Sequence, residues 1–532
     1  MRQGNVMRHF YSYGPVDREE HFCVPRTELI EECTRYLLGN IKKGGHYFTI
    51  WAPRQTGKTW LMRQVKDEIL ARHSERFVVG TMSMQGVSLT EGGPVEEFLD
   101  KIPGLMKRAF KIDRPRYCEG FSDFFLKDNG LFDCPVILFI DEFDNLPPQL
   151  IDRLVNQFRD MYLDRDSYLL HGLALIGVRA VLGVESERGS PFNVQRSMHI
   201  PNFSKEEVSG LFQQYINETG QVIEPAVINK VCDVTRGQPG LVGWFGEILT
   251  EKYNPGTDNT IDVALFERVY HKALSIEWNN TVLNLIKKAR GNYRGHVVRL
   301  FAKSDIPFNI DEDWCNYLYF NGIIDSETTL DSFGQEVDIC RFTCPFIQKR
   351  LYGALSRDLA DDSLPVTALD ILDTLEDVFE PDRLNIVALL QRYRDYLTRL
   401  KTNGLDPWQG QPRRADLRYT EAVGHFHLYA WLQAAIGSRC IISPEFPTGN
   451  GKVDIHLRSG DTDGIIEVKS FTNIYDLKAG KQQAAKYAGS LGKDSVTIAL
   501  FVPSDDKEVQ EKLSAGEILD KVKVTVVPIG WT

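Results

Sequence analysis

The feature that most constrains the fold is a run that is apolar at every position, residues 135–140, and ends in Asp141 and Glu142. A strand with one exposed face would alternate apolar and polar residues, whereas this run leaves no face for solvent. Similar runs occur at 47–51, 76–84 and 169–177, with helical stretches such as 58–73 between them. Buried strands that alternate with helices form a parallel sheet covered on both faces. We therefore predict an α/β domain of three layers over roughly residues 25–200.

A loop with a phosphate-binding pattern follows the first apolar run. Residues 52–59 read APRQTGKT, which matches G-x-x-x-x-G-K-[ST] except that Ala52 replaces the first glycine. In such a loop Lys58 reaches the β- and γ-phosphates and the Thr59 hydroxyl binds Mg²⁺. For the loop alone, a chance GKT on a surface turn stays open as an alternative. The predicted cofactor-binding residues of the loop are Arg54, Gln55, Thr56, Gly57, Lys58, Thr59 and Trp60.

Acidic residues end the buried strand at the sheet edge where open α/β sheets bind ligands. Asp141 is suited to hold Mg²⁺, and Glu142 to polarise an attacking water as a catalytic residue. Arg179 follows a further strand and points to the same edge, where an arginine can sense the γ-phosphate. The alternatives are an ordinary acidic strand end and a surface arginine.

These motifs occur in an order that resembles the AAA-like P-loop ATPases of prokaryotes, close to the STAND signalling NTPases. The resemblance covers residues 8–355 and rests on APRQTGKT, LFIDEFD, LIGVR, SPFNVQRSMHIPNFSKEEV and TRGQPGLV. It implies an ATPase core at 1–200, a helical lid at 201–285, a winged helix at 286–356, and ATP with Mg²⁺ as cofactors. It also makes Pro239 a nucleotide contact, although GQPG is equally a turn before a helix. Within the lid, Ser204 and Glu207 predict a capping box.

Composition fits a chain of several domains without a membrane segment. The 532 residues carry a net charge of −11, and no apolar run reaches the 18 residues of a transmembrane helix. The first residues lack the apolar core of a signal peptide, and the nine cysteines show no zinc spacing. We expect reduced thiols and a cytoplasmic location. The negative charge argues against nucleic acid, but residues 405–532 carry a net charge of only −1.

A second constellation lies near the C-terminus. The strand-like run GIIEVKSF places Glu467 and Lys469 on one face, and pairing through the turn at 458–464 brings Asp454 near Glu467. Converging carboxylates repel unless a cation lies between them, and Mg²⁺ prefers such ligands. Lys469 could then orient or deprotonate a metal-bound water. The alternative is a salt-bridged strand edge.

Residues 415–532 are predicted to form a helix, a strand hairpin, a strand, a helix and a strand. Over 415–503, the spacing D-x₁₂-E-V-K followed by Q-x₃-Y resembles the PD-(D/E)xK nuclease superfamily. Val453 stands where that family has its proline. The resemblance implies metal ligation at Asp454 and Glu467, with Val468 among the metal-binding residues and Mn²⁺ as a substitute for Mg²⁺. It implies the catalytic residues Glu421, Asp454, Glu467, Lys469, Gln483 and Tyr487. His425 shares a helix face with Glu421, and its simplest interpretation is a packed histidine.

Two functions from different classes follow. The first is an ATP-regulated, Mg²⁺-dependent nuclease with its catalytic domain at 405–532, joined through a linker and helical connector at 357–404. DNA is its favoured substrate over RNA, a homo-oligomer or partner subunit is a further expectation, and antiviral defence is an analogy. The second is a nucleotide-dependent switch or scaffold whose nuclease-like domain binds nucleic acid or a partner without cleaving.

Overall fold

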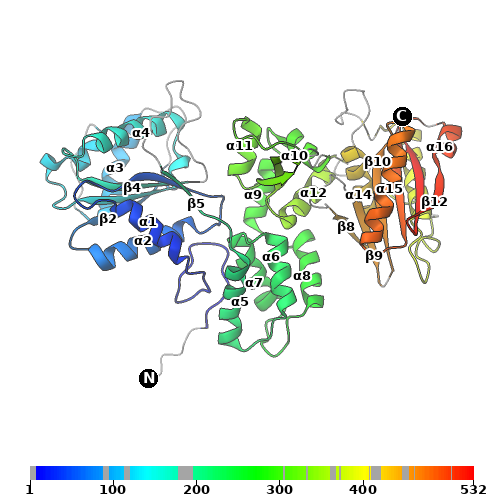
Figure 1. Ribbon diagram of the computed structural model, residues 1–532, viewed down its shortest axis with the longest axis horizontal. Coiled ribbons are helices and arrows are strands. Elements are labelled where there is room, and N and C mark those ends of the chain that lie inside the picture. Colours follow the sequence, from blue (N-terminus) through cyan, green and yellow to red (C-terminus); the bar gives the residue numbers. More distant parts are fainter. Residues whose placement is uncertain are drawn as a thin grey trace. The chain divides into compact units, whose positions relative to one another are not determined.

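The computed structural model describes residues 7–87, 95–112, 120–177, 196–302, 306–330, 334–359, 367–370, 373–406, 408, 421–445, 454–460, 462–504 and 506–531. The chain divides into two compact units (Figure 1). Unit 1 comprises Met1–Thr281 and Tyr317–Ile323, and unit 2 comprises Val282–Asn316 and Ile324–Thr532. The boundaries predicted from sequence at 200, 285, 356 and 404 stay predictions. None of the described helices is long and apolar enough to cross a membrane.

A parallel sheet of five strands forms the centre of unit 1, as predicted. Its order is β2-β3-β4-β1-β5, so β4 separates the strand before the phosphate-loop motif from the strand that ends in Asp141. All its strand pairs are parallel. The strands are β1 (Tyr47–Trp51), β2 (Val78–Ser83), β3 (Val136–Asp141), β4 (Leu170–Gly177) and β5 (Arg196–His199). The sequence analysis missed β5, which is short and lies at the edge.

Helices cover both faces of this sheet (Figure 1). One core joins α1 (Thr27–Leu38) and α2 (Lys58–His73) to the strands, and another joins α3 (Val95–Phe110) and α4 (Pro148–Leu163) to the opposite face. Every residue of β3 is buried, which is why the run 135–140 carries no polar side chain.

Helices follow the sheet in unit 1: α5 (Lys205–Thr219), α6 (Pro225–Thr235), α7 (Pro239–Glu247), a π-helical turn (Ile248–Lys252) and α8 (Val263–Ser275). The capping box that starts α5 is confirmed. Ser204 accepts a hydrogen bond from the Glu207 amide, and the Glu207 carboxylate accepts one from the Ser204 amide. The reciprocal bonds satisfy two amides that the helix leaves unpaired.

Three helices and a hairpin follow, the order expected of a winged helix. These are α9 (Asn280–Ala289), α10 (Arg294–Ala302), α11 (Asp313–Phe320), β6 (Ile324–Leu330), β7 (Glu336–Phe342) and the following helix α12 (Pro345–Leu359). They lie in unit 2 except for the start of α9 and the second half of α11, which belong to unit 1. Tyr352 of α12 stacks on Phe426 of a later helix, with ring centroids 4.6 Å apart. This aromatic packing helps to explain why residues 282–316 and 324–359 group with the C-terminal part of the chain. The described cysteines are free thiols.

A mixed sheet of six strands forms the rest of unit 2, in the order β12-β13-β11-β10-β9-β8. Strands β8, β9 and β10 are antiparallel neighbours, and β11 lies parallel to β10. The strands are β8 (Ile441–Glu445), β9 (Asp454–Ser459), β10 (Thr462–Ser470), β11 (Ser495–Val502), β12 (Ala515–Leu519) and β13 (Val522–Gly530). The order predicted for 415–532 is confirmed as far as β11, but a short helix and the strands β12 and β13 then follow, which the sequence pattern did not indicate. The turn between β9 and β10 is shorter than expected.

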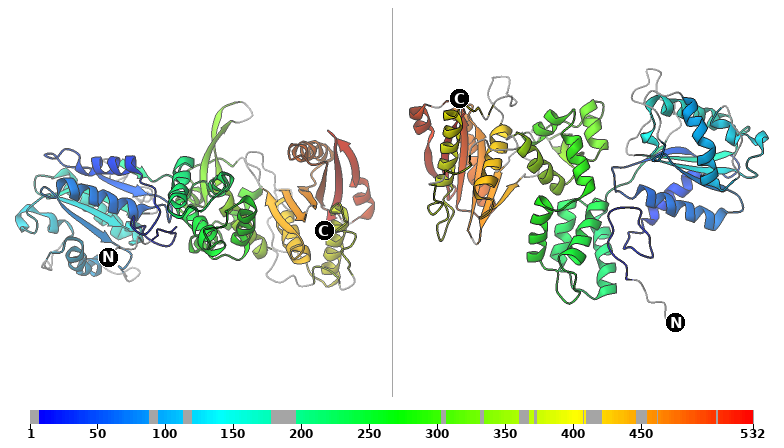
Figure 2. Two further views of the ribbon diagram at one scale, coloured as in Figure 1. Left: turned by 90° about the horizontal axis from the view of Figure 1, so that it is seen from below. Right: turned by 180° about the vertical axis from the view of Figure 1, so that it is seen from behind.

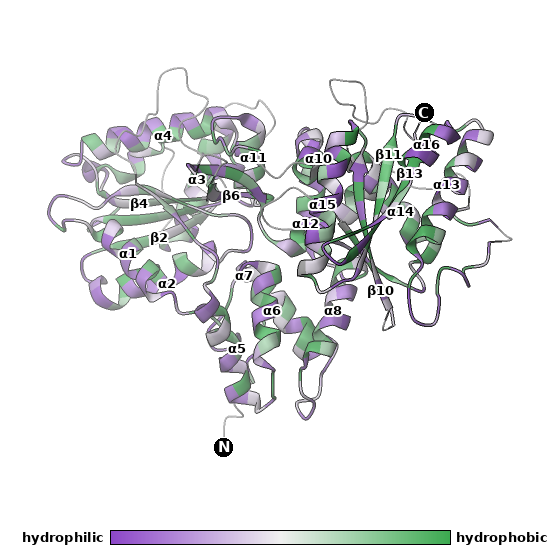
Figure 3. Cartoon of the chain, turned by 45° about the vertical axis from the view of Figure 1, so that its right-hand side comes forward, coloured by the Kyte–Doolittle hydropathy of each residue, from purple (hydrophilic) through white to green (hydrophobic). Residues whose placement is uncertain are grey.

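Helices α13 (Ile386–Thr402) and α14 (Glu421–Ile436) pack on one face of this sheet, and α15 (Ile474–Ser490) packs on the other (Figure 2). The short α16 (Lys507–Leu513) contacts β13. The central strands β11 and β13 and the helix α14 are strongly hydrophobic (Figure 3).

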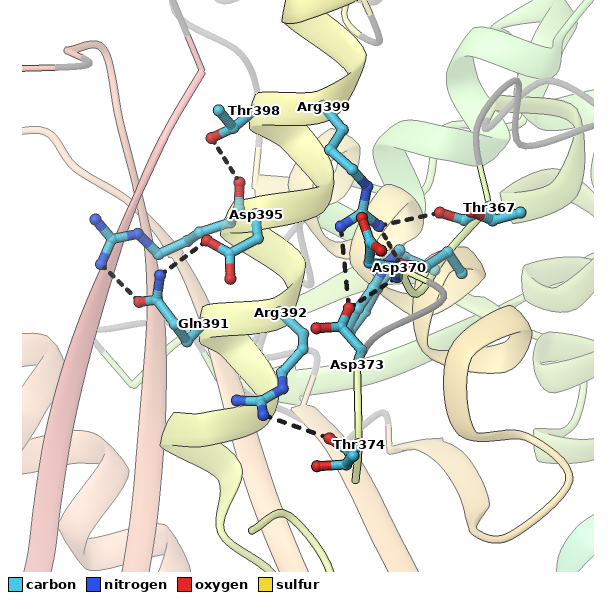
Figure 4. A network of polar contacts seen from close by, with 12 residues as sticks. Thr367, Asp370, Asp373, Thr374, Gln391, Arg392, Asp395, Thr398 and Arg399 are labelled. Carbon is cyan, nitrogen blue, oxygen red and sulfur yellow. Dashed lines mark hydrogen bonds and ion pairs between the residues drawn. The ribbon is translucent and has the colours of Figure 1, made fainter. Parts of the chain in front are cut away.

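Polar contacts hold α13 to the segment before it (Figure 4). Arg399 donates to the Thr367 and Ala368 carbonyls at 3.1 and 3.0 Å, and Arg392 donates to the Thr374 carbonyl and the Asp377 carboxylate at 3.4 and 2.9 Å. These guanidinium contacts satisfy the carbonyls of a segment that has no strand partner for most of its length.

Candidate functional site

The phosphate-binding loop connects β1 to α2, as predicted. Gln55 and Gly57 adopt left-handed backbone conformations, with φ of 59° and 91°. Gly57 is the residue before the first turn of α2, where the helix amides point outward. The environment of Ala52 explains why alanine can replace the first glycine of the pattern. Ala52 is fully buried, and its amide donates to the Gly177 carbonyl of β4 at 3.4 Å. The first motif position therefore belongs to the strand end and has room for a methyl group.

The Lys58 ammonium lies inside this loop. Its Nζ donates to the Ala52 and Pro53 carbonyls at 2.6 and 2.7 Å. Burial lowers the pKa of Lys58 to about 8, against the opposing effect of Asp144 and Asp141, which raises it. A buried ammonium group beside a helix N-terminus favours the binding of an anion there.

A hydroxyl and a carboxylate meet beside the lysine. Thr59 Oγ1 donates to Asp141 Oδ2 at 3.0 Å, and Asp141 also accepts from the Glu142 amide at 3.0 Å. Burial raises the pKa of Asp141, while these two hydrogen bonds lower it. The pair offers hard oxygen atoms of the kind that Mg²⁺ prefers, so the residues present fit a magnesium ion carried with a nucleotide.

Glu142 follows Asp141 in a strained conformation. Its φ is 54°, in the left-handed region that side chains with a Cβ rarely adopt. Its carboxylate accepts from Asn145 Nδ2 at 2.7 Å, and burial together with Asp141 raises its pKa. The strain and the raised pKa suit a residue that positions or polarises water at the strand end.

The start of α7 is bonded to the outer side of the loop. Gln238 Nε2 donates to the Arg54 and Gln55 carbonyls at 3.2 and 3.4 Å, and the Gly240 amide donates to the Gln55 carbonyl at 3.0 Å. A Cβ at Gly240 would lie 2.6 Å from the Gln55 Cβ, so only glycine permits this approach. The sequence analysis named Pro239 here and missed Gln238 and Gly240, although both belong to the quoted GQPG turn.

Two predicted nucleotide residues need separate mention. Trp60 is 6% exposed and packs in the core between α2 and the sheet, with the Arg18 guanidinium 5.5 Å from its ring centroid. A direct nucleotide contact by Trp60 thus stays a prediction. Arg179 lies outside the described residues.

In unit 2, the backbone register brings the predicted metal ligands to one level of the sheet. Residue 454 of β9 lies directly opposite Glu467 of β10. The side chain of Asp454 is outside the described part of the chain, so the pairing is a statement about the backbone. Strand β10 lies between β9 and β11, so Glu467 does not sit on a strand edge.

Glu467 is buried and ion-paired. It is 1% exposed, and its Oε1 lies 3.1 Å from Nζ of Lys469, whose side chain is 16% exposed. The salt bridge that the alternative interpretation required is therefore present, but in the interior of the sheet. A carboxylate at this depth needs a positive charge beside it. Lys469 supplies that charge, and a bound metal ion could supply it as well.

Helix α15 covers the face that carries Glu467. A Cβ at Gly480 would lie 3.9 Å from Cε of Lys469, so the lysine stem runs close to this helix. Tyr487 is half-buried, and its ring centroid lies 6.4 Å from that of His456. His456 pairs with Ile465, two residues before Glu467, and so shares its face. The sequence analysis missed His456, although its alternation with Asp454 could have revealed it.

The remaining predicted residues are placed as follows. Gln483 is exposed one turn before Tyr487. The Val468 side chain is buried in the core on the opposite face, so only its main chain could serve a metal. Glu421 is the first residue of α14, which packs on that opposite face, and its side chain is outside the described part. Among the described side chains, no group of three metal-ligating residues is found.

Two histidines of α14 are structural. His425 and His427 are 2% and 5% exposed, and burial lowers their pKa values to about 3 and about 4. Tyr352 is hydrogen-bonded to His425, and Tyr393 to His427 Nδ1 at 2.6 Å. The interpretation of His425 as a packed histidine is confirmed.

No protein-family model and no curated protein matches the sequence. Among solved structures, the Walker-type ATPase PABY2304 of Pyrococcus abyssi is similar with a TM-score of 0.45 and 17% identity, covering 64% of this chain and 99% of its own. Orc1 of Aeropyrum pernix, solved in complex with DNA, gives 0.32 and 12% over 63% and 93%. RuvB of Thermotoga maritima, a Holliday junction branch migration motor, gives 0.33 and 13% over 57% and 90%. These similarities are weak, and the candidate phosphate-binding site is argued from its own geometry alone.

Proposed function

We propose that the chain is an ATP-hydrolysing, Mg²⁺-dependent nuclease in which unit 1 binds and hydrolyses the nucleotide and unit 2 cleaves phosphodiester bonds. The observation that carries the nuclease part is the buried Glu467, opposite residue 454 and ion-paired to Lys469, in the interior of a sheet. A domain with a purely structural role gains little from an ion pair at this depth, because an apolar pair of similar size would stabilise it as well.

The residues of the unit 2 site divide the chemistry among them. Asp454 and Glu467 would hold the metal ion, which supplies an activated water and neutralises charge on the phosphate. Lys469 would release Glu467 on metal binding and then orient the water as an ammonium, or deprotonate it as a neutral amine after losing its own proton to solvent. Tyr487, Gln483 and Glu421 are the proposed accessory groups, and DNA is the favoured substrate over RNA.

The residues of unit 1 support the nucleotide part. Lys58 would bind the β- and γ-phosphates, Thr59 and Asp141 would hold the magnesium ion, and Glu142 would position the attacking water. The contacts of Gln238 and Gly240 with the loop make α7 sensitive to loop geometry, since Gln238 donates to the Arg54 and Gln55 carbonyls and the Gly240 amide donates to the Gln55 carbonyl. We propose that this connection passes the nucleotide state onward and regulates cleavage.

One experiment separates this proposal from the switch or scaffold alternative, which the Glu467–Lys469 ion pair also permits. Purified protein is incubated with single-stranded and duplex DNA and RNA, with and without ATP, and with Mg²⁺, Mn²⁺ or EDTA. Metal-dependent cleavage that Lys58→Ala alters supports the regulated nuclease. Binding of nucleic acid with no cleavage under any condition favours the scaffold. Equal cleavage by wild type and Lys58→Ala at saturating ATP contradicts the regulation.

A further inference from the structure

The outer face of α15 combines basic and aromatic side chains next to the candidate cleavage site. At 100° per residue, Tyr475, Lys478, Gln482 and Lys486 fall within an arc of about 80° and span about 16 Å of helix. All four are exposed, and Tyr475 is 82% exposed. The preceding residue, Ile474, is 74% exposed. Ile474 and Tyr475 thus extend this face at the start of a helix whose other face is a packed core.

The charge of this face is not cancelled. Asp476 is the only acidic residue of α15, and it is used at the helix start, where it accepts from Thr472 Oγ1 and Asn473 Nδ2 at 2.6 and 2.8 Å. Lys481 points to the flank, where it pairs with Glu517 at 2.8 Å. Lys478 and Lys486 have no acidic partner among the described residues. In a chain with a net charge of −11, this is a local basic surface.

Contacts on the two flanks of α15 show which flank lies toward the candidate cleavage site. Lys481 marks the flank toward β12, because Glu517 belongs to that strand. Tyr487 marks the flank toward β9 and β10, because its ring lies near His456. Gln483 lies between the basic face and Tyr487 on the helix surface. A ligand that extends from the outer face toward Glu467 would therefore pass Gln483 and Tyr487.

From this arrangement we infer that the outer face of α15 binds a single-stranded segment of nucleic acid and guides it to the Glu467–Lys469 site. Lys478 and Lys486 contact successive phosphates, and Tyr475 stacks on a base. An exposed ring can stack only on a base whose face is free, which a single strand offers and an intact duplex does not. This inference rests on the proposed nuclease function and adds the class of its substrate.

The test measures binding apart from cleavage. Fluorescence anisotropy is recorded in EDTA with fluorescein-labelled oligothymidylate, oligouridylate and a duplex of equal length. The wild type should bind at least one single strand more tightly than the duplex. Tyr475→Ala should weaken this binding about fivefold or more, and Tyr475→Phe should retain it. Lys478→Ala and Lys486→Ala should each lower the slope of log affinity against log salt by about 0.7.

Matched controls come from the same unit. Lys507→Ala and Lys512→Ala remove exposed lysines from α16, and Ile518→Ala removes a 75%-exposed apolar residue from β12. These variants should bind as the wild type does. Equal binding by Tyr475→Ala and wild type, or a duplex bound as tightly as both single strands, overturns the inference.

Cleavage with Mg²⁺, measured in parallel, keeps the two proposals distinguishable. If the wild type cleaves and Tyr475→Ala binds the strands as tightly as the wild type, the nuclease proposal is supported and the role of the α15 surface is contradicted. If single-strand binding depends on Tyr475 but no cleavage occurs, the role of the α15 surface is supported and the nuclease proposal is contradicted.

Discussion

Thr59 Oγ1 and Asp141 Oδ2 are joined by a hydrogen bond of 3.0 Å, although 82 residues separate them in the chain. The bond places a hydroxyl and a buried carboxylate where a magnesium ion carried by ATP would bind both. Asp141 also accepts a hydrogen bond from the Glu142 amide, so both of its carboxylate oxygens are hydrogen-bonded.

The first prediction concerns Asp141→Asn. Burial raises the pKa of Asp141 in the folded chain, so the folded state retains the proton over a pH range in which the unfolded state has lost it. The burial penalty is therefore absent at acid pH, grows as the pH rises from the unfolded to the folded pKa, and is complete above the folded pKa. Without nucleotide, Asp141→Asn should raise the unfolding temperature of unit 1 more at pH 7.5 than at pH 4. With Mg·ATP, the ligand-induced rise should be lost. A variant that keeps this rise contradicts the role of Asp141.

The second prediction follows from Lys58. Its pKa is lowered to about 8, so the lysine is largely neutral in the free protein at pH 9, and bound phosphates should return its charge. Nucleotide binding should weaken as the pH rises through about 8 and should take up a proton at pH 9. Calorimetric titration in two buffers of different ionisation enthalpy measures that uptake. Lys58→Ala should bind weakly at every pH and take up no proton. If Lys58→Ala still takes up a proton on nucleotide binding, the proton is bound by a group other than Lys58.

The third prediction separates the contact of α7 with the loop from general helix stability. Gly240→Ala would bring a Cβ to 2.6 Å from the Gln55 Cβ, so it should displace the loop and weaken ATP binding about tenfold or more. Gly210→Ala in α5 is the matched control, because a Cβ there meets nothing within 4 Å. That variant should stabilise unit 1 by about 0.5–1 kcal/mol and leave ATP binding unchanged. Nucleotide titration and thermal unfolding of both variants provide the measurement, and equal ATP affinity in the two would remove the role of α7.

Residue patterns predicted the features that depend on local physics. The apolar run 135–140 predicted a strand buried on both faces, and antiparallel pairing through the turn at 458–464 predicted that Asp454 lies near Glu467, which the backbone pairing of the two residues matches. Patterns could not predict which elements meet. The bonds from Gln238 and Gly240 to the loop connect residues more than 180 positions apart. Likewise, alternation gives no sign that Lys469 would turn back onto Glu467 at 3.1 Å.

The fourth prediction concerns acid stability of unit 2. His425 and His427 have pKa values lowered to about 3 and about 4, so the unfolded state binds protons near pH 6.5 that the folded state does not bind. Unit 2 should therefore lose stability as the pH falls from about 6.5 to about 4. His427→Phe should flatten this dependence, although it costs about 1 kcal/mol at pH 7.5 because Tyr393 loses its hydrogen-bond partner. Denaturant unfolding at several pH values tests this. An unchanged pH dependence in the double variant His425→Phe/His427→Phe would show that other groups are responsible.

The fifth prediction uses the ion pair in unit 2 to detect the metal. Lys469→Ala leaves Glu467 buried without its lysine, which should destabilise unit 2 by about 3–5 kcal/mol in EDTA. If Glu467 binds a metal ion, Mg²⁺ should restore more stability in this variant than in the wild type, while cleavage stays lost. Thermal unfolding with and without Mg²⁺ gives the comparison. Full cleavage by Lys469→Ala, or a Mg²⁺-induced shift no larger than that of the wild type, would contradict the metal site.

The central claim, that unit 2 cuts nucleic acid with a metal ion held by Glu467, is tested most directly by cleavage of DNA by Glu467→Gln. The substitution conserves the volume of the buried side chain and removes its charge. Glu517→Gln is the control, because it removes an ion-paired glutamate on β12. With Mg²⁺ present, the wild type and Glu517→Gln should cleave while Glu467→Gln does not, and all three should hydrolyse ATP at similar rates. Cleavage by Glu467→Gln at the wild-type rate would contradict the account.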